Sequence, residues 1–228
     1  MWASPVYAGR LPNKTLDFVT RNLRGDNTPI LLVAVYGGRH FDNALSEMAL
    51  IARQNGFRPV AAAAVVARHV FSKTLSAGRP NDDDVVQIEA FADGVDFSQC
   101  GVLELPGETV PSSYYTPLRE DLTPARFLKA LPVVDDSLCS HCGSCVSLCP
   151  MGSITVNHSL PQFQGVCIKC QACVCHCPQH AVGFDDADFL SHVRMLESTY
   201  TAPAPNHFFY TNNIMVGSIN SFFDLKMA

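Results

Sequence analysis

The chain has 228 residues, 47% of them hydrophobic and 16% charged, with a formal net charge of −5. This composition excludes a wholly disordered chain, and the acidic balance argues against a broadly basic, nucleic-acid-binding surface. The longest apolar runs, 30–36 and 60–67, are much shorter than the roughly 20 residues of a membrane-spanning helix. The first residues, Met-Trp-Ala-Ser-Pro-Val-Tyr, lack the basic start and apolar run of a signal peptide, so the expected location is the cytoplasm.

Residues 1–99 alternate helix and strand signals and are expected to form one domain. The expected helices begin at the capping residues Asn13, Asp42 and Asn81, and the apolar strands are 30–36 and 58–67. The third helix is expected to bury Val85, Ile88, Phe91 and Ala92. This order predicts an α/β fold with a doubly wound parallel sheet. Residues 100–130 are rich in proline and predict a linker that is at most an ordered connector.

Cysteine placement is the strongest signal in residues 131–185, which we expect to form a second domain. Nine of the ten cysteines lie between Cys139 and Cys177, and the run that starts at Cys139 recurs at Cys167, an offset of 28. Such a repeat implies two copies of one supersecondary unit. Each copy reads C-x2-C-x2-C-x3-C-P, the spacing of [4Fe–4S] clusters in bacterial ferredoxins, whose fourth cysteine serves the other cluster.

The expected ligands are therefore exchanged between the two runs. Cluster I would be held by Cys139, Cys142, Cys145 and Cys177, and cluster II by Cys149, Cys167, Cys170 and Cys173. A structural zinc site is the alternative, but it favours isolated CxxC pairs in four-coordinate sets. Cys100 and Cys175 are surplus to eight ligands and are expected to be ordinary small side chains, with redox sensing as the minor alternative.

The last expected segment, 186–228, contains a helix and an aromatic tail. The helix, over 185–197, would bury Leu190, Val193 and Leu196. The tail carries five aromatic residues, which we expect to dock against the chain itself or a partner: Phe208, Phe209, Tyr210, Phe222 and Phe223.

Two N-terminal segments resemble flavodoxins. Ser-Pro-Val-Tyr-Ala-Gly-Arg-Leu-Pro at 4–12 resembles the end of the third flavodoxin strand and its flavin-contacting loop, and Tyr-Gly-Gly-Arg-His-Phe-Asp-Asn-Ala-Leu at 36–45 resembles the second flavin-side loop. Gly-Arg-Pro-Asn-Asp at 78–82 resembles the entry to the last flavodoxin helix. Joined to the double cysteine motif, the chain is similar over most of 4–185 to two-cluster [4Fe–4S] ferredoxins with an N-terminal flavodoxin-like domain. The resemblance implies an α/β flavodoxin-like domain followed by an α+β ferredoxin domain.

The same resemblance implies FMN as a cofactor, held between two strand-end loops. Its contacts would be Ser4, Pro5, Val6, Tyr7, Ala8, Gly9, Gly37, Gly38, Arg39, Phe41 and Asp42. By this resemblance we expect the sequence to begin inside the third flavodoxin strand, without the phosphate-binding loop that follows a first flavodoxin strand. We therefore expect these 228 residues to bind FMN poorly, and we expect the first strand to be a raw edge available to a partner or for self-association.

Function follows from the predicted clusters, which shuttle single electrons. The leading hypothesis is an electron carrier that serves redox partner proteins, with the flavodoxin-like part as flavin relay or docking surface. The alternative is an FMN-dependent oxidoreductase that reduces a small substrate, although no acid–base constellation stands out in the sequence.

Overall fold

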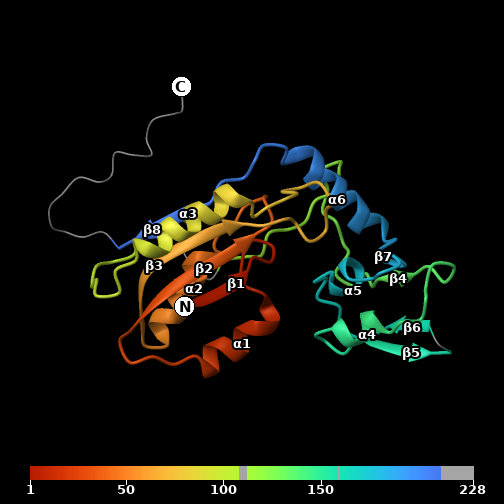
Figure 1. Ribbon diagram of the computed structural model, residues 1–228, viewed down its shortest axis with the longest axis horizontal. Helices are drawn as coiled ribbons and strands as arrows, with labels where there is room; N and C mark the ends of the chain where they lie inside the picture. The colour runs from red at the N-terminus through yellow and green to blue at the C-terminus, as the bar shows by residue number, and fades with distance from the viewer. Residues whose placement is uncertain (108–111, 159, 212–228) are drawn as a thin grey trace.

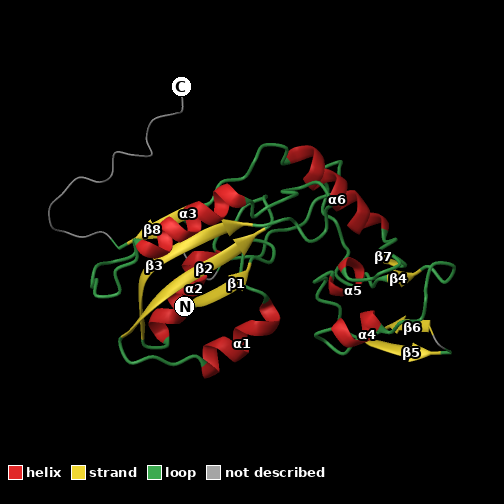
Figure 2. Ribbon diagram, viewed as in Figure 1, coloured by secondary structure: helices red, strands yellow, loops and turns green. Residues whose placement is uncertain are grey.

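The computed structural model describes residues 1–107, 112–158 and 160–211 (Figure 1). An N-terminal sheet region contains β1 (Trp2–Pro5), α1 (Asn13–Asn22), β2 (Thr28–Tyr36), α2 (Ala44–Gln54), β3 (Phe57–Val66) and α3 (Asp82–Asp93). A cysteine region, 131–185, contains β4 (Val133–Val134), α4 (Ser144–Leu148), β5 (Ile154–Asn157), β6 (Leu160–Phe163), α5 (Ala172–Cys175) and β7 (Val182–Gly183). Helix α6 (Ala187–Thr199) leads from the cysteine region back to β8 (His207–Tyr210), which lies in the sheet (Figure 2).

The sheet has the strand order β1-β2-β3-β8. The first three strands are parallel, with Ala3 opposite Val33 and Ala34 opposite Ala64. The predicted parallel α/β arrangement of strands and helices is thus confirmed. β8 pairs antiparallel with β3 and forms one edge, while β1 forms the other edge within the part of the chain that the structure describes.

Helices cover both faces of this sheet, as expected for parallel strands that are buried on both sides. On one face, Leu32 of β2 and Val66 of β3 pack with Leu45 and Met48 of α2, and all four side chains have no exposed surface. On the other face, Ala61 and Ala63 of β3 pack with Phe91 of α3. Residues of β3 therefore contribute to two cores, which explains why its sequence is continuously apolar.

The helix starts were predicted only in part. Asn81 caps α3 as expected, because its side chain accepts a hydrogen bond from the Asp84 N–H while the Asp84 side chain accepts one from Asn81. The other two caps were wrong: Asn13 is the first residue of α1, after Pro12, and α2 is preceded by Asn43 rather than Asp42. Neither Pro12 nor Asn43 makes a side-chain cap hydrogen bond, so local capping chemistry does not set these two starts.

Two predicted apolar faces were also partly wrong. In α3, Phe91 is buried, but Val85 and Ala92 are exposed. In α6, Leu196 is buried, but Leu190 is exposed, and the buried face is formed instead by Phe189, His192 and Met195. Each prediction placed the buried stripe at the wrong angle because neighbouring positions of these helices are apolar as well.

The aromatic tail docks against its own chain where the structure describes it. In β8, Phe208 stacks on Phe91 of α3 with ring centroids 4.9 Å apart, and Phe209 packs on the opposite core. Phe222 and Phe223 lie outside the described residues.

The connector 100–130 is an ordered segment over much of its length. It crosses the loops that follow β1 and β2: the Tyr115 N–H donates to the Ala8 carbonyl, and the Tyr114 hydroxyl donates to the Leu11 carbonyl, both at 2.8 Å. Farther along, Phe127 packs with Phe71 from the loop after β3 and with Phe189 of α6. This aromatic cluster joins the sheet region to the cysteine region. None of the helices found in 1–107, 112–158 and 160–211 has the length and apolarity to cross a membrane.

Candidate functional site

The two cysteine runs fold into two copies of the same turn. His141 and Lys169 occupy equivalent positions and both have left-handed backbones, with φ of 55° and 57°. Gly143 and Gln171 form a second such pair, with φ of 71° and 62°. These left-handed residues turn the chain sharply before α4 and α5, so that each short loop wraps around a common centre. The sequence repeat is therefore a repeat of backbone geometry.

Backbone hydrogen bonds to sulfur follow the same repeat. The Ser153 N–H lies 3.4 Å from Cys149 Sγ, and the Ala181 N–H lies 3.3 Å from Cys177 Sγ. Both are four-residue bonds to the last cysteine of a run, which hold that sulfur in place.

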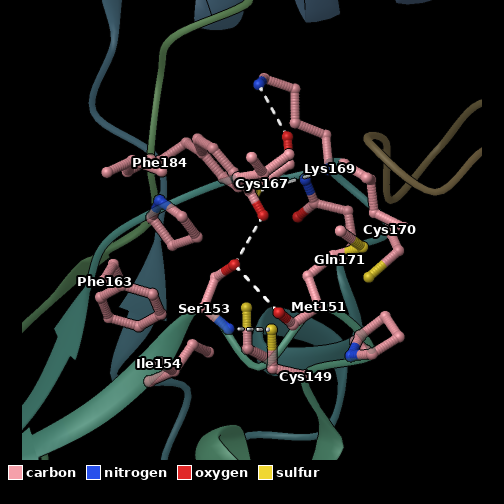
Figure 3. Close-up of a pocket in the computed structure, with 17 residues that line it drawn as sticks. Cys149, Met151, Ser153, Ile154, Phe163, Cys167, Lys169, Cys170, Gln171 and Phe184 are labelled. Carbon is pink, nitrogen blue, oxygen red and sulfur yellow. Dashed lines mark hydrogen bonds between the residues drawn. The ribbon is translucent and has the colours of Figure 1, made fainter. Parts of the chain in front are cut away.

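Each of two cavities is bordered by three cysteines of one run and the last cysteine of the other. The first cavity is lined by Cys139, Cys142, Cys145 and Cys177, with Ser140, His141, Ser144 and Gln179 nearby. The second is lined by Cys149, Cys167, Cys170 and Cys173 (Figure 3). Its remaining walls are mainly apolar, from Met151, Ile154, Phe163, Ile168 and Phe184. The structure thus brings together the two sets of four cysteines that the spacing grouped.

The zinc alternative requires ligands that converge on one point. A tetrahedral zinc ion needs four ligands at about 2.0–2.3 Å from one point. Within the described ranges, no three Cys, His, Asp or Glu side chains converge closely enough for one metal ion.

The two groups also differ in how far they are shielded from water. Cys142 of the first group is exposed, and hydrogen bonding from Ser144, whose hydroxyl lies 3.3 Å from Cys142 Sγ, lowers the pKa of that thiol. In the second group, burial, together with the neighbouring thiols of Cys167 and Cys170, raises the pKa of Cys173 to about 12.

The two surplus cysteines border neither cavity. Cys100 and Cys175 are both exposed. Cys175 lies on α5 with its sulfur 3.8 Å from an Arg68 guanidinium nitrogen. Their positions agree with the expectation that neither is a ligand.

A larger cavity of about 370 Å³ lies between the sheet region, the connector and the second cysteine run. The loop after β1 contributes Val6, Tyr7 and Ala8, and the loop after β2 contributes Arg39. The second cysteine run contributes 166–169, which include Cys167. The carboxyl ends of parallel strands, where ligands of open α/β sheets bind, therefore face one of the cysteine groups.

The eleven residues predicted to contact flavin are divided by the structure. Four line the cavity: Val6, Tyr7, Ala8 and Arg39. Others shape its loops, since the Gly9 carbonyl accepts a hydrogen bond from the Asn43 N–H and a Cβ on Gly9 would lie 2.2 Å from the Asp42 carboxylate. Gly37 and Gly38 similarly adjoin His69 and Ser76, and Asp42 pairs with Arg39. Ser4 and Pro5 belong to β1, and Phe41 is buried in the sheet core, so these three lie away from the cavity.

Several lining residues were missed by sequence reasoning. One of them is Tyr115, whose ring centroid lies 4.1 Å from Cζ of the Arg39 guanidinium. The others are His69, Phe71, Phe127, Lys169 and His192. They come from four separate segments, and no sequence pattern links them. Only the folded arrangement brings them to one wall.

The cavity holds titratable side chains that favour their neutral forms. Burial lowers the pKa of His69 to about 4 and also lowers the pKa of His192, while burial raises the pKa of Tyr7. His192 Nδ1 lies 2.8 Å from the Leu118 carbonyl, which only accepts, so Nδ1 carries the proton. No sequence pattern indicated that these three side chains would line one cavity.

Comparison with known proteins identifies one part of the chain. Residues 132–155, which contain the first cysteine run, match the family described as 4Fe-4S binding domain. No curated protein gives a significant match to the chain. The match supports a ferredoxin-type region in this chain, with at least one [4Fe–4S] cluster and iron–sulfur electron transfer as its general role.

Proposed function

We propose that this chain is an electron carrier with two [4Fe–4S] clusters. The observation that carries the proposal is the pair of cavities, each bordered by four cysteines with one exchanged between the runs. The repeated turns at His141 and Lys169 and the repeated N–H bonds to Cys149 and Cys177 support equal roles for the two runs. When bound, such clusters accept and release single electrons.

The proposed ligands of cluster I are Cys139, Cys142, Cys145 and Cys177, and those of cluster II are Cys149, Cys167, Cys170 and Cys173. The protein's part is to hold these sulfurs, to supply N–H donors and to set how much water reaches each group. Cluster I would exchange electrons with redox partner proteins, because its cavity includes the exposed Cys142. Cluster II would face the large interior cavity, since Cys167 lines both.

Substitution of the exchanged cysteines tests this proposal. We expect Cys177→Ser to damage cluster I and Cys149→Ser to damage cluster II, each with loss of up to half the iron. Mössbauer and EPR spectra of anaerobically prepared protein distinguish the two losses, and Cys175→Ser is the matched control that should retain all iron. Swapped losses, or equal damage to both clusters by each substitution, would contradict the exchanged assignment.

We further propose that the sheet region is flavodoxin-like and that its cavity admits the isoalloxazine ring of FMN, which makes the region a flavin relay. The volume, the apolar walls and the aromatic side chains Tyr7 and Tyr115 fit a planar ring. The chain offers no phosphate loop of the flavodoxin kind among its described residues, and each lost hydrogen bond to a charged group is worth about 1.5–3 kcal/mol. The ring is therefore accommodated while the phosphate is held poorly, and FMN binding is weak.

Titration with FMN and with riboflavin tests this part. Because the phosphate adds little, we expect both ligands to bind weakly and with similar affinity, with Tyr7→Ala weakening both. Phe18→Ala, on an exposed position of α1, is the control and should change neither affinity. Tight FMN binding with no riboflavin binding would show that a phosphate site exists after all. No binding of either would leave the sheet region as a docking surface only.

A second candidate function, an FMN-dependent oxidoreductase that reduces a small substrate, is favoured by the acid–base groups in the cavity. His69, His192 and Tyr7 line the cavity that would hold both the flavin ring and a substrate. Their neutral forms suit a donor of the Tyr type and an acceptor of the His type. Consumption of reduced viologen by flavin-loaded protein only when a small electrophile is added, and its loss in His192→Gln, would favour this function over simple electron transfer.

The proposed cellular setting is the cytoplasm, with redox proteins as partners and no nucleic acid. The edge strand β1 is the proposed surface for a partner or for self-association, because an uncovered strand edge presents unpaired backbone groups. Sedimentation at several protein concentrations tests self-association, and an unchanged monomer at high concentration would exclude it.

A further inference from the structure

Lys169 is a buried lysine in the second cysteine run, and burial lowers the pKa of its ammonium group while Cys167 and Asp186 oppose that shift. It is only 8% exposed, and its ammonium group donates to the Leu128 carbonyl at 2.7 Å and to the Cys167 carbonyl at 3.4 Å. Within the described residues it has no carboxylate partner within 4.0 Å. A buried charge that contacts only neutral acceptors is costly unless an opposite charge lies near it.

The surroundings of Lys169 supply little of that opposite charge. The charged and titratable groups that act on it are the Cys167 thiol and the Asp186 carboxylate. Asp186 is already engaged as the N-cap of α6, where it accepts the Phe189 N–H at 2.8 Å. The remaining neighbour able to carry negative charge is the group of four thiolates itself.

Lys169 lies between two of the cavities described above. Lys169 lines both the second cysteine cavity and the large interior cavity. Figure 3 shows its side chain rising away from the sulfurs of Cys149 and Cys170, with the ammonium next to the Cys167 carbonyl. The charge therefore lies at the boundary between the two cavities, on the carbonyl of a cysteine that borders both.

The first run provides an internal comparison. At the position equivalent to Lys169 it has His141, with the same left-handed backbone but an exposed side chain. Its cavity also has polar neighbours, whereas the second cavity has mainly apolar walls. One-electron reduction adds a negative charge, which apolar walls oppose and a nearby buried cation favours.

We propose that Lys169 is a charge-compensating residue that raises the midpoint potential of cluster II. The inference rests on the proposed two-cluster function. Its role is to offset the apolar surroundings, so that the cluster beside the interior cavity stays reducible. His141 has no equivalent effect on cluster I, because water screens its position.

The test is an EPR-monitored redox titration of the full chain, with dithionite as reductant. In Lys169→Met we expect the ratio of reduced to oxidised cluster II at a fixed potential to fall at least tenfold, equivalent to 59 mV for one electron, with cluster I unchanged. Lys169→Arg keeps the charge and should stay close to the unaltered protein. His141→Met, the matched control in the first run, should shift neither cluster by a comparable amount.

Lys169→Gln keeps an N–H donor for the Leu128 carbonyl and covers the case in which Lys169→Met loses iron. Two normal cluster signals with unshifted potentials in either neutral variant would overturn the inference alone. Loss of iron in both neutral variants but not in Lys169→Arg would also overturn it, because Lys169 would then be structural. Absence of a second cluster from the unaltered protein would overturn the proposed function and this inference together.

Discussion

The sheet region buries Leu32, Leu45, Met48 and Val66 completely, whereas the described residues of 131–185 bury only a few apolar side chains: Pro132, Ile154, Pro161, Ala181 and Val182. The secondary structure of the two regions differs in the same way. β2 and β3 have nine and ten residues, but β4 and β7 have two each and α5 has four. Elements this short are not stable by themselves. The comparison indicates that the sheet region is organised by its own side chains and the cysteine region by what its sulfurs bind.

Removal of iron should therefore unfold one region and leave the other folded, and this is the largest effect we expect. Treatment with an oxidant and a chelator should unfold 131–185, because metal binding contributes directly to folding in regions with so small a core. Limited proteolysis should then cut within 131–185, while fluorescence of Trp2, the single tryptophan, should still report a folded sheet. Reconstitution with ferrous iron and sulfide should restore protection. A cysteine region that stays protected without iron would refute the comparison.

Substitution of a buried charge in the sheet region should have the opposite effect: it should destabilise the sheet and leave the clusters intact. Asp84 is 1% exposed, pairs with Arg79 and accepts a 2.8 Å hydrogen bond from Asn206. Asp84→Ala leaves Arg79 without its partner and should lower the free energy of unfolding of the sheet region by about 3–5 kcal/mol. Urea denaturation followed by Trp2 fluorescence measures this change.

The matched control for Asp84 is Asp83→Ala, an exposed acid in the same helical turn, which should change stability by no more than about 0.5 kcal/mol. Iron content should be the same in both variants. Loss of clusters in Asp84→Ala would mean that the two regions depend on each other more than their cores suggest.

A smaller effect on the free energy of unfolding is expected at acid pH, because of His69. Burial lowers its pKa in the folded chain to about 4, from 6.5. As pH falls from 6.5 to 4, the unfolded chain takes up a proton that the folded chain does not, so stability is lost by at most about 1.4 kcal/mol for each pH unit. His69→Gln should flatten this slope in urea denaturation of the sheet region. An unchanged slope would show that His69 is protonated in the folded chain within this range.

The smallest effect is expected at a surplus cysteine. Cys175→Ser changes an exposed side chain that borders neither cysteine cavity, so iron content should be unchanged and stability should shift by no more than about 0.5 kcal/mol. Cys173→Ser, two residues earlier, should lose cluster II. Equal iron loss in the two variants would require Cys175 to be a ligand.

The features predicted from sequence are those fixed by local chemistry. Asn81 was recognised as a cap because Asn81 and Asp84 exchange hydrogen bonds within one turn, and the apolar strands 30–36 and 58–67 differ from β2 and β3 by a few residues at their ends. The cysteine groups could be predicted because spacing alone determines which sulfurs a short loop can bring together.

The features that were missed depend on contacts between distant segments. The exposed Val85 and Leu190 cannot be distinguished by periodicity from neighbouring apolar residues, because the packing partner sets the buried face. The sequence did not predict that β8 would pair with β3, since its aromatic residues fit equally well against a partner. The cavity beside Cys167 requires Tyr7, His69, Tyr115 and His192 to meet, and no local pattern connects them.

The central claim is that both cysteine groups hold iron–sulfur clusters, and metal analysis tests it most directly. Anaerobically prepared protein should contain about eight irons and about eight acid-labile sulfides per chain, in two cubes of four, with little zinc. About four irons would mean that only one group binds a cluster. Stoichiometric zinc with negligible sulfide would contradict the account altogether.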